Sequence, residues 1–509
     1  MTFAWAAASG LLLYFCQPNF RFGFLAWGAL FFILQAARQA PHAAKAFRLG
    51  YVCGLVFFLP GLYWLRHVAF PACVFAVLFE ALFIGFFALL IYWGRRFTPG
   101  LYSIIWMAGS WTLVEWLRTE IPVLGFGWHL LAYSQSFYPV ILQSANTVGV
   151  YGLGFAIAAV NACGVNAWEM RVRAAEPQGK IRLFFIAGGV PLIVGLIAAH
   201  GFYQLSRPEN GGEQLRMALV QSNIPEAIKW RPEAKDRILE VQMKLTQLAS
   251  FDSPDLVVWP EASFPGYFNR DAEAAQVREL AQKIHAPILI GSPHYEKDGV
   301  YYNSAYLVRG PEAAEERYDK MRLVPFGEYV PFKFALGWLM PLADAFGVGD
   351  FSAGQTFKLF RLYDDVPFGV MICFEDIFPH IARRFVESGA RFLVVITNDS
   401  WFGRTAAPYQ HLAASIFRAV ETGVPVVRTA NTGVSALISA RGRVTQRIRS
   451  QKSEDLFVTG QGTGFITLKR GPTHYMRSGY MFPVVVLLVM ANLGLMLWLK
   501  YGREKYGKI

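Results

Sequence analysis

The sequence predicts a polytopic α-helical membrane part joined to one extramembrane α/β domain. Of the 509 residues, 54% are hydrophobic and only 17% are charged, a composition too apolar for a soluble enzyme of this size. The long apolar runs lie toward the two ends of the chain, whereas 204–477 has no such run and alternates strand and helix patterns. We therefore expect seven transmembrane helices in 1–203, the α/β domain in 204–477, and an eighth helix with a basic tail in 478–509.

Eight apolar runs supply the predicted membrane helices. Most of them approach the roughly 20 residues that a helix needs to cross a bilayer, although two are short. The first run lacks a preceding basic segment and an evident cleavage site, so we interpret it as a membrane span rather than a removable signal peptide. The runs are 3–20, 22–37, 49–65, 70–94, 100–114, 139–168, 183–203 and 478–499.

Basic residues in the short loops predict how the chain crosses the membrane. If the amino terminus lies in the cytoplasm, the inside loops hold 13 Lys and Arg and the outside loops hold three. Because cytoplasmic loops carry the excess of basic residues, both termini should be cytoplasmic and 204–477 should lie outside. The same asymmetry explains much of the net charge of +12, so no nucleic-acid partner is needed to account for it.

Glu80 interrupts the apolar run 70–94. Ionisable residues inside a membrane are costly and often functional, so one interpretation is a transporter or receptor whose outer domain binds a ligand. The other interpretation is structural, with Glu80 hydrogen-bonded between helices. The sequence leaves the role of Glu80 open between these two.

Strand and helix patterns alternate along 204–477, which predicts an α/β domain with a largely buried sheet. The prolines and glycine of 318–331 indicate that this segment is mostly loop, and a second loop covers 398–403. The predicted strands are 216–221, 256–261, 287–291, a hairpin-like pair in 301–309, 367–372, 392–397, 425–429 and 434–438, and the predicted helices are 232–248, 272–285, 377–388 and 408–422.

Cys373 follows the buried-strand pattern 367–372 and is the candidate nucleophile. Strand ends are where an α/β sheet presents reactive side chains to a crevice. The other four cysteines lie in predicted membrane helices, so Cys373 is the only thiol of 204–477 and has no disulfide partner there. Such a cysteine is either a small buried apolar residue or a reactive thiol.

Glu261 and Lys320 offer the two further groups that a thiol nucleophile needs. A thiol with an ordinary pKa of about 8.5 is mostly protonated near neutrality, so a carboxylate base within reach would take its proton during attack. Glu261, at the end of strand 256–261, suits that role. A fixed ammonium stabilises the oxyanion of a tetrahedral intermediate, which suits Lys320. On these residues alone, a surface or helix-capping carboxylate and a solvated lysine stay open as alternatives.

Three short motifs together resemble the nitrilase superfamily of carbon-nitrogen hydrolases. They are Trp-Pro-Glu261, Tyr-Asp-Lys320 with the following Leu-Val-Pro-Phe-Gly-Glu328, and Ile-Cys373-Phe-Glu. The resemblance implies a triad of Glu261, Lys320 and Cys373 on an α-β-β-α sandwich. The eight apolar runs, with the domain inserted before the last, are similar to a membrane-bound branch of that superfamily, the apolipoprotein N-acyltransferases of Gram-negative bacteria.

Further residues extend this resemblance over nearly the whole chain. Glu328 resembles a second glutamate that helps to position the lysine and the intermediate. The family usually has tyrosine directly after the cysteine, so Phe374 can keep a packing role but lacks the phenol. The resemblance implies substrate-binding or intermediate-stabilising roles for Glu328, Trp230, Phe374, Glu375, Asn398 and Trp401, and it extends to Tyr133-Ser-Gln135, Gln143 and Tyr151-Gly152 in the membrane part.

The resemblance implies a two-step acyl transfer. Cys373 would attack the sn-1 ester of a membrane phospholipid, typically phosphatidylethanolamine, to give a thioester and a lysophospholipid. The α-amino group of the N-terminal diacylglyceryl-cysteine of an apolipoprotein would then take the acyl chain. The implied partners are phospholipid, apolipoprotein and the bilayer of the inner membrane, with the α/β domain in the periplasm. Neither a metal nor an organic cofactor is required.

A membrane-anchored carbon-nitrogen hydrolase is the alternative enzyme. Such an amidase or nitrilase would act on a small amide and would share Glu261, Lys320 and Cys373. It offers no reason for eight membrane helices, whereas a reaction between two lipid substrates does.

The segment 329–351 is long and rich in large apolar residues and glycines. A long excursion of this kind is unusual in a compact domain unless it is functional. We expect a lid that places Phe334, Trp338 and Leu339 in the outer leaflet and shields the thioester. The alternative is a loop that packs its apolar side chains on its own domain.

Overall fold

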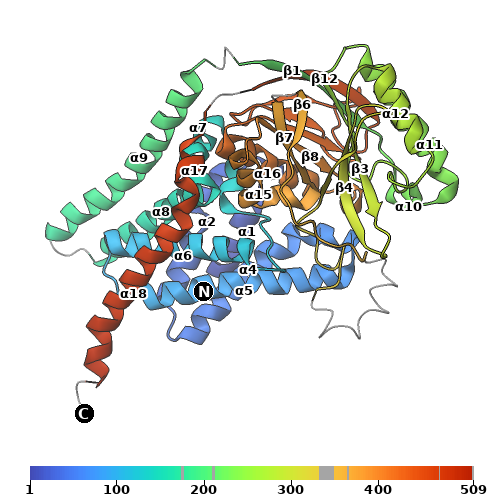
Figure 1. The fold of residues 1–509 in the computed structure, drawn as a ribbon. Helices are drawn as coiled ribbons and strands as arrows, with labels where there is room; N and C mark the ends of the chain where they lie inside the picture. The colour runs from blue at the N-terminus through green and yellow to red at the C-terminus, as the bar shows by residue number, and fades with distance from the viewer. Residues whose placement is uncertain (174–176, 209–211, 332–348, 364–365, 469–470, 507–509) are drawn as a thin grey trace. The chain divides into compact units, whose positions relative to one another are not determined.

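The computed structural model describes residues 1–173, 177–208, 212–331, 349–363, 366–468 and 471–506. The chain forms two compact units (Figure 1). The helical unit comprises Met1–Arg66, Phe70–Arg207 and His474–Ile509. The α/β unit comprises His67–Ala69 and Pro208–Thr473.

Apolar helices make up the helical unit. Within the described residues, five helical segments are long and apolar enough to cross a membrane: Ala43–Gly61, Phe70–Gly94, Ala145–Val172, Gly188–Ser206 and Gly479–Lys500. Thr2–Phe15 and Gly23–Arg38 are shorter apolar helices. The helices are α1 (Thr2–Phe15), α2 (Ala26–Ala29), α3 (Phe31–Arg38), α4 (Ala43–Gly61), α5 (Phe70–Gly94), α6 (Leu101–Glu120), α7 (Pro139–Leu142), α8 (Ala145–Arg173), α9 (Pro177–Ser206), α17 (His474–Arg477) and α18 (Phe482–Tyr506).

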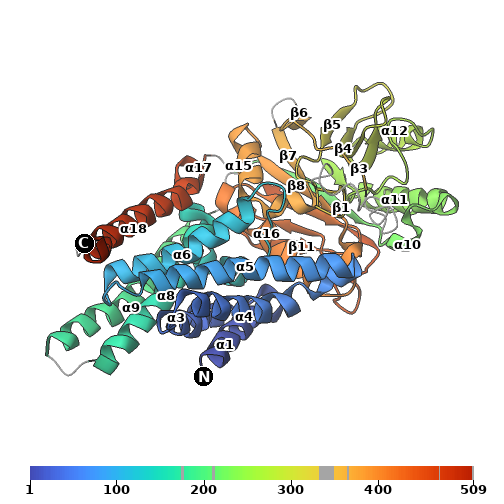
Figure 2. The same cartoon turned by 90° about the horizontal axis from the view of Figure 1, so that it is seen from below.

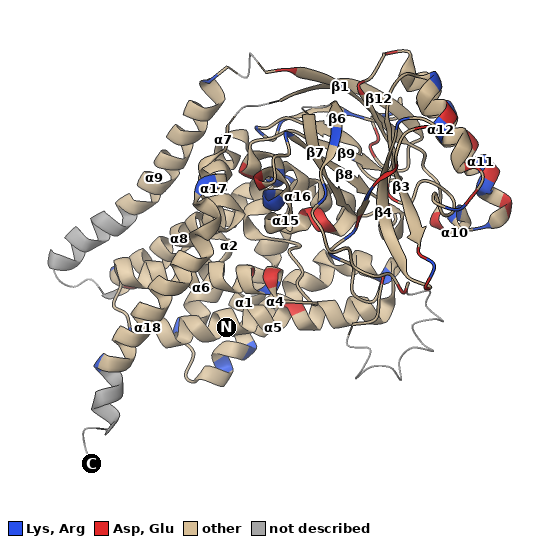
Figure 3. Ribbon diagram, viewed as in Figure 1, with Lys and Arg blue, Asp and Glu red and all other residues tan. Residues whose placement is uncertain are grey.

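Glu80 on α5 forms a buried ion pair with Arg118 on α6. The guanidinium Nη1 lies 2.9 Å from Glu80 Oε2, and both side chains are nearly inaccessible to solvent. Arg118 also donates to the main-chain oxygens of Phe126 at 3.1 Å and Trp128 at 2.8 Å. Charged residues are sparse on the helices of this unit (Figure 3), and an internal pair is the usual way to bury one between helices. The contact favours the structural interpretation of Glu80.

Two six-stranded sheets form the centre of the α/β unit. The first has the order β12-β1-β2-β3-β4-β5 and the second has the order β11-β10-β9-β8-β7-β6. In each sheet the central pairs are parallel and the outer pairs are antiparallel. The strands are β1 (Gln214–Gln221), β2 (Leu256–Val258), β3 (Ile288–Tyr295), β4 (Tyr301–Val308), β5 (Glu316–Asp319), β6 (Phe360–Tyr363), β7 (Val366–Ile372), β8 (Phe392–Thr397), β9 (Val426–Ala430), β10 (Ala436–Ile438), β11 (Val444–Arg447) and β12 (Gly460–Thr467).

Helices cover the outer face of each sheet, so the layers follow the expected α-β-β-α order (Figure 2). Helices α11 (Lys235–Ser250) and α12 (Ala274–Lys283) share one apolar core with β1 to β4. Helices α15 (Pro379–Glu387) and α16 (Ala407–Thr422) pack on the second sheet. The two sheets contact each other where β1 meets β9 and where β4 meets β7. Buried parallel strands of this kind are apolar along their whole length, as in the run Phe-Leu-Val-Val-Ile-Thr of β8.

The structure corrects some of the predicted elements. The segment 301–309 is one strand, β4, and its hairpin partner is β3, which extends to Tyr295. Strands β5, β6, β11 and β12 were not predicted, because each lies at a sheet edge and is only partly buried. The predicted loop 398–403 contains a 3₁₀ helix, Asp399–Phe402. The proposed lid residues Phe334, Trp338 and Leu339 lie outside the described residues.

A fully buried ionic cluster lies behind the carboxyl ends of β7 and β8. His411 on α16 faces Asp376 through Nε2 at 2.8 Å and Asp399 through Nδ1 at 3.1 Å. Arg428 on β9 pairs with the same two carboxylates at 3.1 and 3.2 Å. Burial and Arg428 oppose a charge on His411, but the two aspartates outweigh them and raise its pKa to about 9. The cluster therefore holds two cations against two anions near neutral pH.

This cluster predicts an alkaline limit to stability. A histidine whose pKa is raised from 6.5 to about 9 on folding stabilises the native state fully below pH 6.5 and loses that contribution as the pH rises through 9. The contribution is about 3 kcal/mol. The melting temperature of the full chain in detergent should thus fall between pH 7 and pH 10, and His411→Gln should lower the neutral-pH value and flatten this alkaline loss.

The exposed His285, changed to Asn, is the matched control and should leave the profile unchanged. An equally steep alkaline loss in His411→Gln would show that another group is responsible.

Candidate active site

Cys373 occupies a sharp turn at the end of β7. It is the first residue of the 3₁₀ helix Cys373–Ile377, and its φ of 53° lies in the left-handed region that side chains other than glycine rarely adopt. Strained residues of this kind concentrate at functional sites, where the surrounding structure holds them in place. The side chain is 9% exposed, so the thiol can be reached but is nearly enclosed.

Glu375 ties the turn at Cys373 to the segment that carries Lys320. Its Oε2 accepts from the main-chain N–H of Ile372 at 2.7 Å, and its Oε1 accepts from the N–H of Met321 at 2.7 Å. The hydroxyl of Tyr318 also donates to Oε1, at 2.8 Å. Burial raises the pKa of Glu375 to about 7 against these hydrogen bonds. Each oxygen of Glu375 therefore accepts from groups that position Lys320 and Cys373.

Lys320 lies between two carboxylates. Its ammonium Nζ is 3.4 Å from Glu261 Oε1 and 2.9 Å from Glu328 Oε1, and the side chain is 1% exposed. The amide of Asn303 on β4 donates to both carboxylates, at 2.8 Å each. The remaining oxygen of Glu261 accepts from the main-chain N–H of Asn398 at 2.8 Å. The structure thus brings Glu261 together with Lys320 and Glu328 from two separate parts of the sequence.

The charges of this centre set the resting protonation states. Burial opposes ionisation of Glu261, but Lys320 and the Asn303 amide outweigh it and lower the pKa of the carboxyl. Burial also opposes a charge on Lys320, but Glu328 and Glu261 outweigh it and raise the pKa of the ammonium. Burial and the charge of Glu261 raise the pKa of the Cys373 thiol well above its usual range. The resting centre therefore contains a carboxylate, an ammonium and a protonated thiol.

Phe374, Asn398 and Trp230, which the sequence also indicated, differ in how deeply they are buried. Phe374 is 7% exposed and packs edge-on against Phe378, with 5.2 Å between ring centroids. The Asn398 amide donates to Glu226 Oε2 at 2.8 Å, and Glu226 Oε1 accepts from Trp230 Nε1 at 3.2 Å. Trp230 is thus joined to the site through Glu226 and Asn398, and it is half exposed.

Trp401 is 43% exposed and lies on the 3₁₀ helix that follows Asn398. Neighbouring Ser400 donates to Glu226 Oε2 at 2.7 Å. Trp401 therefore stays a candidate for substrate contact on the sequence resemblance alone.

Sequence reasoning missed Asn303, Glu226 and Lys229. Asn303 lies on β4, which contains no recognisable sequence motif. A polar residue in a buried strand does, however, indicate a specific hydrogen-bonding role. Glu226 and Lys229 belong to the short helix α10 (Glu226–Lys229), which directly precedes Trp230. The burial of Lys229 is evident only from the three-dimensional structure, because an isolated lysine in a loop-rich segment is ordinarily solvated.

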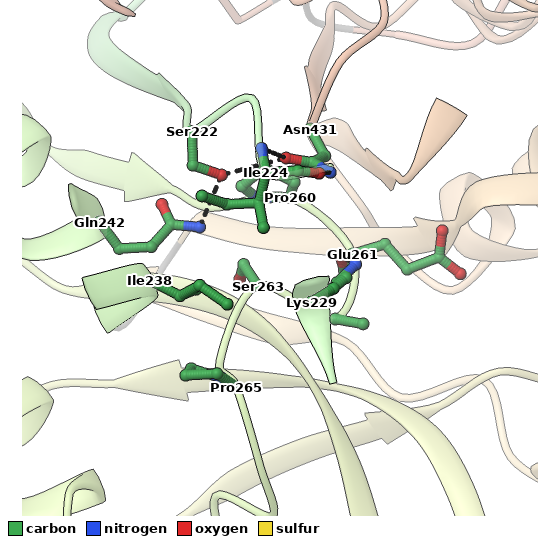
Figure 4. A pocket seen from close by; sticks show the side chains of 11 residues that line it. Ser222, Ile224, Lys229, Ile238, Gln242, Pro260, Glu261, Ser263, Pro265 and Asn431 are labelled. Carbon is green, nitrogen blue, oxygen red and sulfur yellow. Dashed lines mark hydrogen bonds between the residues drawn. The ribbon is translucent and has the colours of Figure 1, made fainter. Parts of the chain in front are cut away.

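A small cavity lies beside Glu261 (Figure 4). Its volume of about 10 Å³ has room for one water molecule at most. Gln242 donates to Ser222 Oγ at 3.0 Å, and Ser222 Oγ donates to Asn431 Oδ1 at 3.2 Å along one wall. The lining residues are Ser222, Ile224, Lys229, Ile238, Gln242, Pro260, Glu261, Ala262, Ser263, Pro265 and Asn431.

Comparisons with known proteins identify both parts of the chain. Residues 9–163 match the apolipoprotein N-acyltransferase N-terminal domain, and residues 216–460 match the carbon-nitrogen hydrolase family. A relative from Geobacter metallireducens, named apolipoprotein N-acyltransferase, is 36% identical over 94% of this chain and 91% of its own length. A Brucella suis relative of the same name is 31% identical over 98% of this chain and 96% of its own.

A solved amidase of the nitrilase superfamily from Nesterenkonia is 18% identical over 53% of this chain and 95% of its own, with a TM-score of 0.38. The matches to the curated relatives run through the helical unit as well as the α/β unit. The chain therefore belongs to the apolipoprotein N-acyltransferase family.

Proposed function

We propose that this enzyme moves an acyl chain from a membrane phospholipid to the α-amino group of the N-terminal diacylglyceryl-cysteine of apolipoproteins. Membership of the apolipoprotein N-acyltransferase family supports acyl transfer as the reaction. The observation that carries the chemistry is the Glu261–Lys320–Glu328 cluster, buried together at 3.4 and 2.9 Å and linked through Glu375 to the turn of Cys373. We propose Glu261, Lys320 and Cys373 as the catalytic residues.

In the first half-reaction Cys373 Sγ attacks the carbonyl carbon of the phospholipid ester. The thiol proton passes to Glu261, whose lowered pKa keeps it ionised and ready to accept a proton. Because the pKa of the thiol is raised, the proton leaves as the sulfur attacks, and no free thiolate is needed beforehand. The ammonium of Lys320 stabilises the oxyanion. The ester C–O bond then breaks, and Glu261 returns the proton to the departing lysophospholipid.

In the second half-reaction the α-amine attacks the thioester carbonyl. Glu261 takes a proton from the attacking nitrogen, the C–S bond breaks, and the proton returns to the sulfur of Cys373. Water is the competing nucleophile, and the 9% exposure of Cys373 favours transfer over hydrolysis. Glu328 and Glu375 act in this scheme as positioning residues, Glu328 on the ammonium and Glu375 on the main chain around Lys320 and Cys373.

Substrate contacts are proposed for two exposed tryptophans near the site. Trp230 and Trp401 are each exposed by more than two fifths, and both adjoin the Glu226–Asn398 link. Large amphipathic rings of this kind suit the acyl and glyceryl parts of a lipid. Phe374 lacks a phenol and contributes packing only.

The alternatives receive less support. A membrane-anchored amidase would share the three catalytic residues, but the relatives named apolipoprotein N-acyltransferase also match the helical unit. The main argument for a transporter was the ionisable Glu80 within an apolar run. Glu80 pairs with Arg118 at 2.9 Å, which favours a structural role instead.

We propose an inner-membrane location with eight spans, both termini cytoplasmic and the catalytic domain in the periplasm. The proposed parts are 1–203, 204–477 and 478–509. Support comes from the apolar helices, of which five meet the length and hydropathy of a span among the described residues, and from the 13-to-three excess of basic residues in the inside loops.

Two substitutions test the proposed catalytic roles of Glu261 and Lys320. Glu261→Gln should lower transfer to a diacylglyceryl lipopeptide at least about 100-fold, because no base takes the thiol proton, and Lys320→Met should lower it similarly by removing the oxyanion's counter-charge. The measurement is the initial rate with labelled phosphatidylethanolamine in mixed micelles. Glu273→Gln, a partly exposed carboxylate paired with Lys235 at 2.9 Å, is the matched control.

Near-normal transfer by Glu261→Gln would contradict the assignment of the base. A wild-type enzyme that hydrolyses small amides but transfers no acyl chain to the lipopeptide would favour the amidase.

The proposed topology is tested with fusions of a phosphatase that is active only outside the cytoplasm. A fusion at residue 350 should be active, and fusions at residues 97 and 506 should be inactive, because the inside loops carry the basic excess. A green fluorescent protein that matures only in the cytoplasm should give the opposite pattern. Bright fluorescence from the fusion at residue 350 would overturn the orientation.

A further inference from the structure

Lys229 is a buried ammonium that the mechanism above does not use. The side chain is 4% exposed, and its Nζ donates to the main-chain oxygen of Glu261 at 3.3 Å. Among the described residues no carboxylate lies within 4.0 Å of this nitrogen. Burial lowers the pKa of Lys229, although Glu226, Glu261 and Cys373 act against that change. A buried lysine without an ion-pair partner is costly, and the Trp230 ring, whose centroid lies 5.6 Å from Nζ, compensates only part of that cost.

The small cavity beside Lys229 leaves no room for an outside counter-ion. Figure 4 shows Lys229 and Glu261 on the same side of the small cavity, whose volume is about 10 Å³. That space holds one water molecule at most and excludes a hydrated anion. The nearest negative side chain of its own helix, Glu226, is partly exposed and accepts from Trp230, Asn398 and Ser400. Glu226 offsets part of the charge of Lys229, and Glu261 and Cys373 of the reaction centre also interact with that charge.

The charges of the reaction centre do not balance without Lys229. Glu261 and Glu328 contribute two negative charges, and Lys320 contributes one positive charge. The neighbouring Asp399 is already matched within the cluster of His411 and Arg428. A net charge of minus one would disfavour every anionic species formed on the substrate or on the sulfur. Adding the charge of Lys229 brings the sum over these four residues to zero, while Glu375 and the partly exposed Glu226 lie outside this group.

We infer that Lys229 is the second cation of the reaction centre and stabilises the anionic sulfur and oxygen species that form at Cys373 during each acyl transfer. Lys320 acts at close range between its two carboxylates, and Lys229 acts from its contact with the main-chain oxygen of Glu261. The inference rests on the proposed function for its role in acyl transfer. The effect on the sulfur itself does not depend on which substrate the enzyme uses.

Alkylation of Cys373 by iodoacetamide tests the inference without any lipid substrate. The full-length protein in detergent is treated over pH 6 to 11, and the modification of Cys373 is followed by peptide mass. In Lys229→Met the rate at each pH below the pKa of the thiol should fall about 10-fold, which corresponds to a rise of about one unit in that pKa. Lys229→Arg should stay close to wild type, because it keeps the charge.

Lys235→Met is the matched control, since Lys235 is a partly exposed lysine paired with Asp271 and Glu273 and lies near the same helix. Thermal melting reports whether each variant is folded, and Lys229→Gln replaces Lys229→Met if the latter unfolds. A folded, neutral variant with the wild-type alkylation profile would overturn the inference. A shifted profile in an enzyme that transfers no acyl chain to lipopeptide would keep the inference and refute the proposed function.

Discussion

The active site depends on the burial of one ammonium group. Lys320 is 1% exposed, and a lysine can lose its water only if protein groups compensate its charge. Glu261 and Glu328 provide that compensation, and Asn303 holds the two carboxylates in place through one amide. Buried ion pairs of this type add little net stability, but breaking one is strongly destabilising. The main effect of these ion pairs is therefore to orient the Lys320 ammonium rather than to stabilise the fold.

The two sheets meet at this centre. Glu261 and Lys320 follow strands of the first sheet, and Cys373 ends a strand of the second. Hydrogen bonds join the two sides: Met321 to Glu375 at 2.7 Å and Asn398 to Glu261 at 2.8 Å. Behind Cys373 lies the ionic cluster of His411, which also faces the main-chain oxygen of Cys373 at 3.3 Å. The strained turn at Cys373 is thus held from both sides, which accounts for a φ of 53° in a residue with a side chain.

Much of the fold and of the candidate active site could be predicted from the sequence, but the physical reason differs from one element to the next. Strands β7 and β8 are continuous apolar runs because both faces are buried, so their ends, and with them Cys373, were placed correctly. Edge strands such as β12 have no such pattern, since solvent covers part of them. The role of Glu80 could not be predicted, because Arg118 lies 38 residues away and only helix packing brings the two together. Asn303 and Lys229 were missed for the same reason: their contacts are set by tertiary structure.

In the proposed reaction an acyl chain travels through a thioester on Cys373. The most direct measurement is the intact mass of the full-length protein after incubation with a phosphatidylethanolamine of defined acyl chains, followed by peptide mapping. We expect a mass increase equal to the sn-1 acyl group, located on the peptide that contains Cys373 and lost when a diacylglyceryl lipopeptide is added. Transfer to the lipopeptide that continues in Cys373→Ala, or an acyl group found on a different residue, would contradict the proposed reaction.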